Sequence, residues 1–423
     1  MSQSSAASPP DRPSRSTGER TADDTAGMTA DELAEAKRYG RYDLACTLAD
    51  KALDVAYLAA VATFAARAVD GWLAGLPWLG ASDTLRLAAL ALLVTAGHWL
   101  VASPLAFYSD YVLEHRFGLS RLSWRRWLWR YLKKCLLAAV LAVIVFVGLF
   151  WIIWTCHWAW WMVGAVVFFL FGAVLGQLFP VLILPLFYRI ERLDDETLTA
   201  PLVELARGTG IAIEGVYRIA LSEETVKANA MLAGLGRTRR VLLGDTLLSG
   251  FAPEEMEVIF AHEVGHHVLR HVGKMMAVGL VASGLCFWTC DLLLRAWSGG
   301  AGVDYAQFPV HALPLMMLLL TLVTLVLGPL HNALSRRWEL QADRYALDRT
   351  GRREAFASAF RKLAWLNKED PDPHWLDVLL FHSHPPIARR LALAEQDIAG
   401  APAADGPRPT GEEATRPSTA PAE

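Results

Sequence analysis

Long apolar stretches are the feature that most constrains the fold of this chain. Six segments of roughly 20 residues carry few charges, at about 52–74, 85–107, 135–154, 158–184, 274–296 and 311–330. A helix needs about 20 apolar residues to cross about 30 Å of hydrocarbon. Any one segment is also compatible with a buried core helix, but six in a chain of 423 residues predict a helical integral membrane protein.

The composition agrees with separate apolar and polar regions. Hydrophobic residues make up 54% of the chain although 20% are charged, which an ordinary soluble domain does not combine. The net charge of −3 argues against a nucleic-acid partner. All five cysteines lie in or beside apolar segments without zinc-site spacing, which predicts free thiols. Abundant alanine and arginine are a weak indication of a bacterial source with GC-rich coding.

The distribution of lysine and arginine predicts the orientation in the membrane. The loops at 75–84, 155–157 and 297–310 contain none. Between the second and third apolar segments lie Arg116, Arg121, Arg125, Arg126, Arg130, Lys133 and Lys134. Because basic residues remain on the cytoplasmic side, we expect both termini and the polar regions after the fourth and sixth segments to be cytoplasmic.

These patterns divide the chain into six regions and predict a mostly α fold, with about six transmembrane helices and a small β-hairpin or sheet. Thr29 to Glu32 form a capping-box signature for a polar helix through Arg41, and 212–221 and 240–243 resemble short strands. The regions are a disordered arm (1–27), four membrane helices (28–184), a polar insert (185–273), two membrane helices (274–330), a polar helical region (331–397) and a disordered tail (398–423).

The polar insert contains a His-Glu-x-x-His motif at 262–266. Pro253 followed by two glutamates suits the first turn of a helix, which places the motif inside that helix. Residues four apart share a helix face, so His262 and His266 can direct two imidazoles to one Zn²⁺ ion. Glu263 can accept a proton from water at that point. The alternative is a chance match in a polar helix.

A third zinc ligand is expected after the last apolar segment, because catalytic zinc sites usually have three protein ligands. Glu339 and Asp343 are four residues apart and share a helix face. Glu339 can bind the metal, and Asp343 can accept a hydrogen bond from the free ring nitrogen of a ligand histidine. Alternatively, they form a solvated face that pairs with Arg336 or Arg344. The motif at 262–266 favours metal binding by Glu339 over the solvated face, and the three ligands predict one Zn²⁺ per chain.

A hairpin is predicted before the zinc motif. Lys227–Leu232 precedes a glycine-rich turn at 234–236 and the strand at 240–243. One edge would present unpaired N–H and C=O groups, to which an extended peptide can bind whatever its sequence. The small Ala228 and Ala230 leave room for a second backbone. The alternative is an ordinary surface hairpin.

Several motifs together resemble one family. They are Tyr111–Leu119, Pro185–Phe187 with Leu193-Asp194, Asn229-Ala230 with Gly234, Asp245–Leu248, Ser335-Arg336 with Glu339 and Ala342-Asp343, and His384–Pro386 with Arg390. This set resembles the membrane zinc metalloproteases of the CAAX prenyl protease type, the Ste24-like branch of the M48 peptidases. The resemblance extends from about Ala34 to Leu393. Long family members have seven spans, and the span missing here is the N-terminal one.

The resemblance implies specific roles for the site residues. His262, His266 and Glu339 would bind zinc, Glu263 would be the base, and Asp343 would orient a ligand. His384 and Arg390 would contact the substrate backbone or stabilise the oxyanion. The substrate would bind along Asn229 and Ala230. Eukaryotic members cut prenylated C-terminal tails, whereas a bacterial chain is expected to act on membrane-associated peptides or damaged membrane proteins.

The predicted function is therefore that of a multi-pass zinc metalloendopeptidase in a bacterial cytoplasmic membrane. Its partners would be the lipid bilayer and a peptide or membrane-protein substrate, with the zinc site facing the cytoplasm. A quality-control membrane protease of the same superfamily is the closest alternative. An intramembrane protease is disfavoured, because charged residues flank the motif. A non-catalytic metal-binding scaffold or transport protein also remains open.

Overall fold

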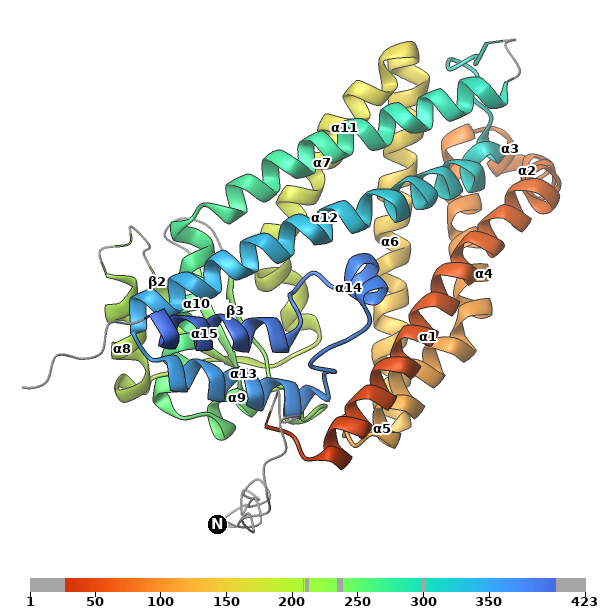
Figure 1. Cartoon of the computed structure of the whole chain (residues 1–423). Coiled ribbons are helices and arrows are strands. Elements are labelled where there is room, and N and C mark those ends of the chain that lie inside the picture. Colours follow the sequence, from red (N-terminus) through yellow and green to blue (C-terminus); the bar gives the residue numbers. More distant parts are fainter. Residues whose placement is uncertain (1–26, 208, 210–212, 234–238, 299–301, 401–423) are drawn as a thin grey trace, which may run out of the picture.

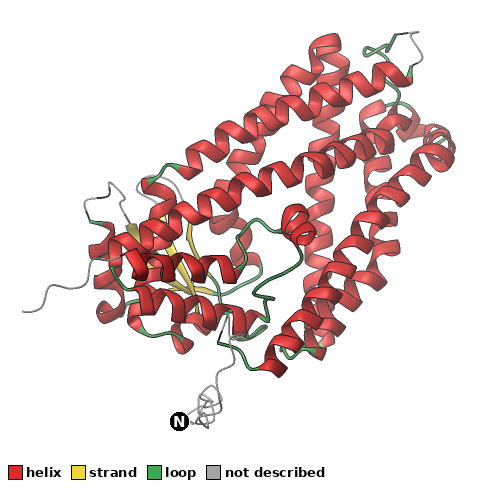
Figure 2. Ribbon diagram, in the orientation of Figure 1, coloured by secondary structure: helices red, strands yellow, loops and turns green. Residues whose placement is uncertain are grey.

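The computed structural model describes residues 27–400 except 208, 210–212, 234–238 and 299–301. Long helices run through an elongated molecule (Figure 1). A small sheet lies at one end, among shorter helices (Figure 2). The expected N-terminal arm lies outside the described residues apart from Gly27, and the expected tail apart from 398–400.

Apolar helices form most of the fold. They are α1 (Ala30–Ala60), α2 (Ala66–Ala74), α4 (Asp83–Phe107), α6 (Trp124–Cys156), α7 (Trp160–Leu178), α11 (His271–Trp297) and α12 (Leu313–Thr350). Within the described residues, five continuous helical segments are long and apolar enough to cross a membrane. Their largest buried cluster includes Leu87 and Leu90 of α4, Phe150 of α6, Trp160 of α7 and Leu313 of α12.

The expected third and fourth spans fall within one of these five segments, Trp124–Leu186. A straight helix of its 63 residues would be about 95 Å long. The chain instead breaks at His157, whose φ is 50°, between α6 and α7. Leu149 of α6 and Ala165 of α7 share one buried cluster, so the two helices pack together. Because five candidate segments are found, the count of six crossings stays a prediction.

The N-terminal helix is longer than predicted. Thr29 N–H donates to Glu32 Oε2 at 2.7 Å, and Glu32 N–H donates to Thr29 Oγ1 at 3.3 Å, which is the expected capping box. The helix does not end near Arg41 but continues through a π-helical turn, Val61–Ala65, into α2. Tyr39 and Cys46 pack against Phe117 and Leu119. This tertiary contact stabilises a stretch whose sequence is too polar to resemble a span.

The polar insert forms a four-stranded sheet in the order β1-β2-β4-β3. Strand β4 pairs in parallel with β2 and antiparallel with β3, and β1 pairs antiparallel with β2. The strands are β1 (Ile190–Arg192), β2 (Ile213–Ile219), β3 (Ala230–Ala233) and β4 (Arg239–Gly244). The predicted hairpin is the β3–β4 pair, and its turn lies outside the described residues. Strand β1 was not predicted, because three residues with two exposed charges show no alternation.

Shorter helices cover the sheet and complete the polar end. They are α8 (Glu196–Ala206), α9 (Asp245–Gly250), α10 (Pro253–Val268), α13 (Arg353–Asn367), α14 (Trp375–Phe381) and α15 (Ile387–Gly400), with α3 (Pro77–Gly80) and α5 (Glu114–Arg116) elsewhere. Val241 and Leu243 of β4 pack against Phe260 and Val264 of α10, while Leu242 faces the other side. Helix α15 continues to Gly400, so 398–400 are not part of a disordered tail.

Loops with and without basic residues lie at opposite ends of the membrane helices. Val226 N–H donates to Leu119 O at 3.1 Å, and Arg121 N–H donates to Glu224 O at 2.8 Å, which joins the basic loop to the polar insert. At the other end, Trp154 Nε1 donates to Phe308 O at 2.8 Å. The fold thus separates the loops as the charge pattern requires.

All five cysteines are free thiols, as expected from their sequence positions. Cys46, Cys286 and Cys290 are buried, and the other two are half-buried.

Candidate active site

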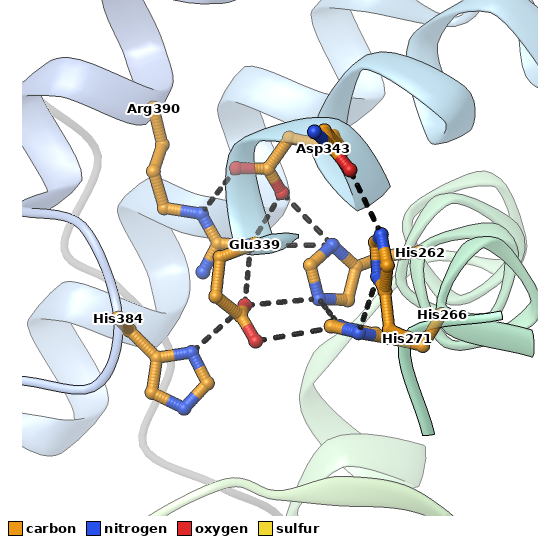
Figure 3. Close-up of polar contacts among 8 residues, drawn as sticks. His262, His266, His271, Glu339, Asp343, His384 and Arg390 are labelled. Atoms are coloured by element: carbon orange, nitrogen blue, oxygen red, sulfur yellow. Dashed lines mark hydrogen bonds and ion pairs between the residues drawn. The ribbon is translucent and has the colours of Figure 1, made fainter. Parts of the chain in front are cut away.

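Two helices bring three potential metal ligands to one point. Helix α10 carries His262 and His266, and α12 carries Glu339 (Figure 3). The Nε2 atoms of the two histidines are 3.2 Å apart. Glu339 Oε2 lies 3.2 Å from His262 Nε2, and Glu339 Oε1 lies 3.3 Å from His266 Nε2. Within the described residues, this is the group of His, Cys, Asp or Glu side chains that could hold a metal ion.

The spacing of these atoms fits a zinc ion. Ligand atoms at 2.0–2.1 Å from a tetrahedral zinc are about 3.3–3.4 Å from one another, close to the three distances above. Glu339 Oε2 is a buried oxygen that accepts no hydrogen bond of good geometry, although imidazole nitrogens surround it. A buried carboxylate oxygen without such a bond is costly. A cation at this point would therefore complete its environment.

Local interactions fix the start of α10. Pro253 occupies the first helical turn, where its missing N–H costs nothing. Glu255 is 4% exposed and accepts a hydrogen bond from Ala252 N–H at 2.8 Å. The same carboxylate accepts from Ser358 Oγ and Lys362 Nζ of α13, each at 2.6 Å. The zinc-motif helix is thereby held against α13 before its histidines are reached.

Asp343 and Arg390 hold the ring of His262. Asp343 is fully buried, and its Oδ1 lies 2.9 Å from His262 Nδ1. Because Nδ1 then carries a proton for this carboxylate, Nε2 is left free to bind a metal. Arg390 Nε donates to Asp343 Oδ2 at 2.8 Å, and Nη2 donates to Oδ1. The Arg390 guanidinium lies 3.8 Å from the ring centre of Phe360.

The electrostatics of the site favour ionised carboxylates. Burial opposes protonation of His262, but Asp343 and Glu339 outweigh it and raise its pKa to about 9. Burial raises the pKa of Glu339, yet the adjacent imidazoles of His262, His266 and His384 hold that pKa far below its usual range. Burial likewise raises the pKa of Asp343, and Arg390 with His262 lowers it overall. The carboxylate of Glu339 is therefore negatively charged at neutral pH.

Glu263 and His384 are less buried than the two carboxylates of the cluster. Glu263 is half-buried and makes no hydrogen bond or ion pair with the described residues. It follows His262 directly, so its carboxylate can receive a proton near the metal position. His384 is 61% exposed, and its Nδ1 lies 2.8 Å from Glu339 Oε2. It comes from the segment between α14 and α15.

Arg390 is buried against Asp343, whereas the resemblance implies that it contacts the substrate backbone or stabilises the oxyanion. The side chain is only 7% exposed, it donates two hydrogen bonds to Asp343, and its Nη2 lies 3.4 Å from His262 Nδ1. Its Nη2 is 4.0 Å from Glu339 Oε2. These contacts favour a role in positioning Asp343 over a direct contact with substrate.

Ala230 begins β3, an edge strand of the sheet, and Asn229 directly precedes it. Gly244 N–H donates to Asn229 O at 2.9 Å, so Asn229 and Gly244 form a hydrogen-bonded pair. In an antiparallel ladder the next pair, Ala230 with Leu243, points its N–H and C=O groups away from the partner strand. Ala230 also packs beside Met256 and Ile259 of α10. The exposed Asn229 and the backbone of Ala230 thus present an open edge close to the zinc-motif helix.

The Tyr111–Leu119 motif lies against the segment that leads to this edge. Glu114 Oε1 accepts hydrogen bonds from Tyr39 OH at 2.6 Å and Lys227 Nζ at 2.9 Å. Lys227 precedes Asn229 by two residues. The motif therefore connects the membrane helices to the start of the edge strand.

Two residues near the metal position were not assigned from the sequence, His271 and Gln341. His271 lies beside His266, and Gln341 lies beside His271. Their sequence signals were a histidine five residues after His266 and a glutamine between Glu339 and Asp343. Arg270 adopts a left-handed conformation between α10 and α11, so helical periodicity does not predict where His271 points.

Family models match both halves of the chain. The model for "Peptidase family M48" matches residues 192–397. The model for "CAAX prenyl protease N-terminal, five membrane helices" matches residues 18–189.

Individual proteins and one solved structure are also similar. The uncharacterized metalloprotease YhfN of Bacillus subtilis is 32% identical over 61% of this chain and 60% of its own length. CAAX prenyl protease 1 of Saccharomyces cerevisiae is 27% identical over 70% of this chain and 69% of its own length. The crystal structure of S. mikatae Ste24p matches with a TM-score of 0.76 and 22% identity, over 89% of this chain and 92% of that one, which shows a shared fold.

Proposed function

Because this chain belongs to the membrane branch of peptidase family M48, we propose that it is a membrane-embedded zinc metalloendopeptidase. The two family models account for 18–189 and 192–397, in agreement with the Ste24-like motifs. The observation that carries the proposal is the convergence of His262 Nε2, His266 Nε2 and Glu339 within 3.2–3.3 Å of one another.

In the proposed mechanism, one zinc ion held by these side chains would polarise the scissile carbonyl and acidify the attacking water. Glu263 takes the proton of that water and passes it to the leaving amine, because it is half-buried without a competing partner. Asp343, held by Arg390, keeps His262 in the tautomer that offers Nε2. His384 is exposed beside Glu339 and can donate a hydrogen bond to the developing oxyanion.

The substrate binds as an extended strand along β3. The outward N–H and C=O of Ala230 supply main-chain hydrogen bonds that do not depend on substrate sequence. A cavity of about 1030 Å³ lies between α1 and the 367–382 segment. Lys227 and His382 line it, two residues before Asn229 and His384 respectively. It therefore offers space next to both the edge strand and the exposed histidine.

We propose that the substrates are membrane-associated peptides or damaged membrane proteins. Cleavage would not require a prenylated tail on the substrate. A similar protein carries the name metalloprotease without a stated substrate, and another is named a CAAX prenyl protease. The open main-chain edge requires no particular side chain. We also propose a bacterial cytoplasmic membrane with the zinc site on the cytoplasmic side, because the basic loop contacts the polar insert.

The test compares the purified wild-type protein with Glu263→Gln and Glu254→Gln in lipid nanodiscs. Glu254 is exposed on the same helix, so its variant is a matched control. The wild type should bind one zinc and cleave a mixture of membrane-associated peptides. Glu263→Gln should keep the zinc and lose at least about 1000-fold in kcat, as expected for an essential proton carrier. Cleavage by Glu263→Gln at the wild-type rate, or a wild type that binds no zinc, would contradict the proposal.

A further inference from the structure

His271 is a fully buried histidine next to a proposed zinc ligand. Its Nδ1 lies 3.1 Å from His266 Nδ1, and its Nε2 lies 3.0 Å from Gln341 Oε1. The ring is stacked on Trp338, with ring centres 6.0 Å apart. Both of its nitrogens are therefore used, and both partners belong to the helices that carry the metal ligands.

The proton positions along this chain of contacts follow from chemistry. A histidine that binds a metal through Nε2 carries its hydrogen on Nδ1. His266 Nδ1 must then donate to His271 Nδ1, which accepts. The hydrogen of a neutral His271 is left on Nε2, and it donates to Gln341 Oε1, an oxygen that can only accept. Because the amide oxygen of Gln341 can only accept, the hydrogen bonds run in one direction, from His266 through His271 to Gln341.

We propose that His271 and Gln341 are positioning residues that orient His266 for zinc binding. Each ligand histidine then has its own support: a carboxylate, Asp343, for His262, and a neutral imidazole, His271, for His266. A buried apolar side chain would fill the same space, but it would leave His266 Nδ1 without an acceptor. This inference rests on the proposed zinc site and adds a residue pair that its ligand set does not contain.

The location of His271 also links the zinc site to the membrane helices. His271 is the first residue of α11, which follows the zinc-motif helix after the left-handed Arg270. Gln341 lies on α12, two residues from Glu339 and from Asp343. A shift of α11 would therefore move His271, and a shift of α12 would move Gln341. Either shift would turn the ring of His266.

The test measures zinc affinity of the full-length protein by chelator competition, together with the visible spectrum of the Co²⁺ form. In His271→Leu the acceptor is lost, and the zinc dissociation constant should rise about 10–100-fold. In His271→Asn the amide oxygen takes the place of Nδ1, so affinity should stay within about threefold of wild type and the Co²⁺ spectrum should be restored. His331→Leu removes an exposed histidine from α12 and should change neither measurement.

A second pair of variants covers the case in which His271→Leu fails to fold. Gln341 is exposed, so Gln341→Met should fold. It should weaken zinc binding several-fold, while Gln341→Glu should retain it because it keeps an acceptor oxygen. Equal losses for His271→Asn and His271→Leu would show a packing role and overturn the inference, as would unchanged affinity in Gln341→Met. A wild type that binds no zinc would overturn the proposed function as well, which separates the two failures.

Discussion

Gly265 of α10 lies directly against Ala342 of α12. A Cβ atom at position 265 would be 3.3 Å from Ala342 Cα and 3.0 Å from Tyr345 Cδ1. Gly265 stands between the two ligand histidines, and Ala342 stands between Glu339 and Asp343. Contact between two such small residues lets the helix backbones approach closely enough for the ligand side chains to meet.

Gly265→Ala should therefore weaken zinc binding. The added methyl group has to displace backbone as well as the Tyr345 ring, which costs about 1–3 kcal/mol in a tight interior. We expect a lower melting temperature and a zinc dissociation constant raised by roughly tenfold or more. Gly273→Ala is the matched control, because no atom lies within 4 Å of a Cβ there. Equal behaviour of the two variants would contradict the close-approach argument.

Replacing Arg390 should act on stability and metal binding before substrate binding. Arg390→Met leaves the fully buried carboxylate of Asp343 without its cation, a loss of about 3–5 kcal/mol in comparable buried pairs. Zinc affinity should fall with it, because His262 loses its support. Arg389→Met, at an exposed neighbouring position, should resemble wild type. A raised KM with normal zinc content and melting temperature would instead favour direct contact with substrate.

Zinc binding should release a proton at neutral pH. Burial opposes the charge on His262, but Asp343 and Glu339 raise its pKa to about 9, so the metal-free protein holds this proton at pH 7. A histidine ligand must be neutral, so zinc affinity should rise about tenfold per pH unit between roughly 7 and 9 and level off above. Calorimetric titrations in buffers of different ionisation enthalpy count the protons. No proton release at pH 7 would refute the assigned charge.

Ala230→Pro should impair substrate binding while sparing the fold. The N–H of Ala230 points away from β4, so proline deletes a hydrogen bond to substrate and none within the sheet. We expect a raised KM or no cleavage, with normal zinc content. Ala230→Ser keeps the N–H and should cleave normally. Met231→Pro removes a hydrogen bond to β4 and should unfold the edge. Normal kinetics in a folded Ala230→Pro protein would support the ordinary surface hairpin.

Cysteine labelling checks the proposed orientation. In a cysteine-free background, Trp78→Cys should react with a membrane-impermeant maleimide from outside, because Trp78 is 71% exposed on the short helix α3, in a connection without basic residues. Arg125→Cys, at an exposed position in the first turn of α6 among the basic residues, should react only after the membrane is opened. The opposite pattern would place the zinc site outside the cytoplasm.

Local patterns in the chain were sufficient for much of the fold. The capping box at Thr29, the strand at 240–243 and the apolar helices depend on neighbours in sequence. The structure contains the capping box, the strand and, within the described residues, five helical segments long and apolar enough to cross a membrane. Predictions weakened where a local pattern was absent. Strand β1 has only three residues, and the continuation of α1 beyond Arg41 depends on packing of Tyr39 and Cys46 against Phe117.

The sequence by itself determined the chemistry that is possible here. Helical spacing puts His262 and His266 on one face, and Glu339 and Asp343 on another, because 3.6 residues make a turn. Only the tertiary structure decided that these faces meet, since 72 residues, including the long helix α11, lie between His266 and Glu339 in the sequence. Gly265 contacts Ala342, and Arg390 is buried against Asp343, although each pair is distant in sequence. The irregular backbone at Arg270 likewise brings His271 to His266. No local periodicity encodes them, because they follow from how the helices pack.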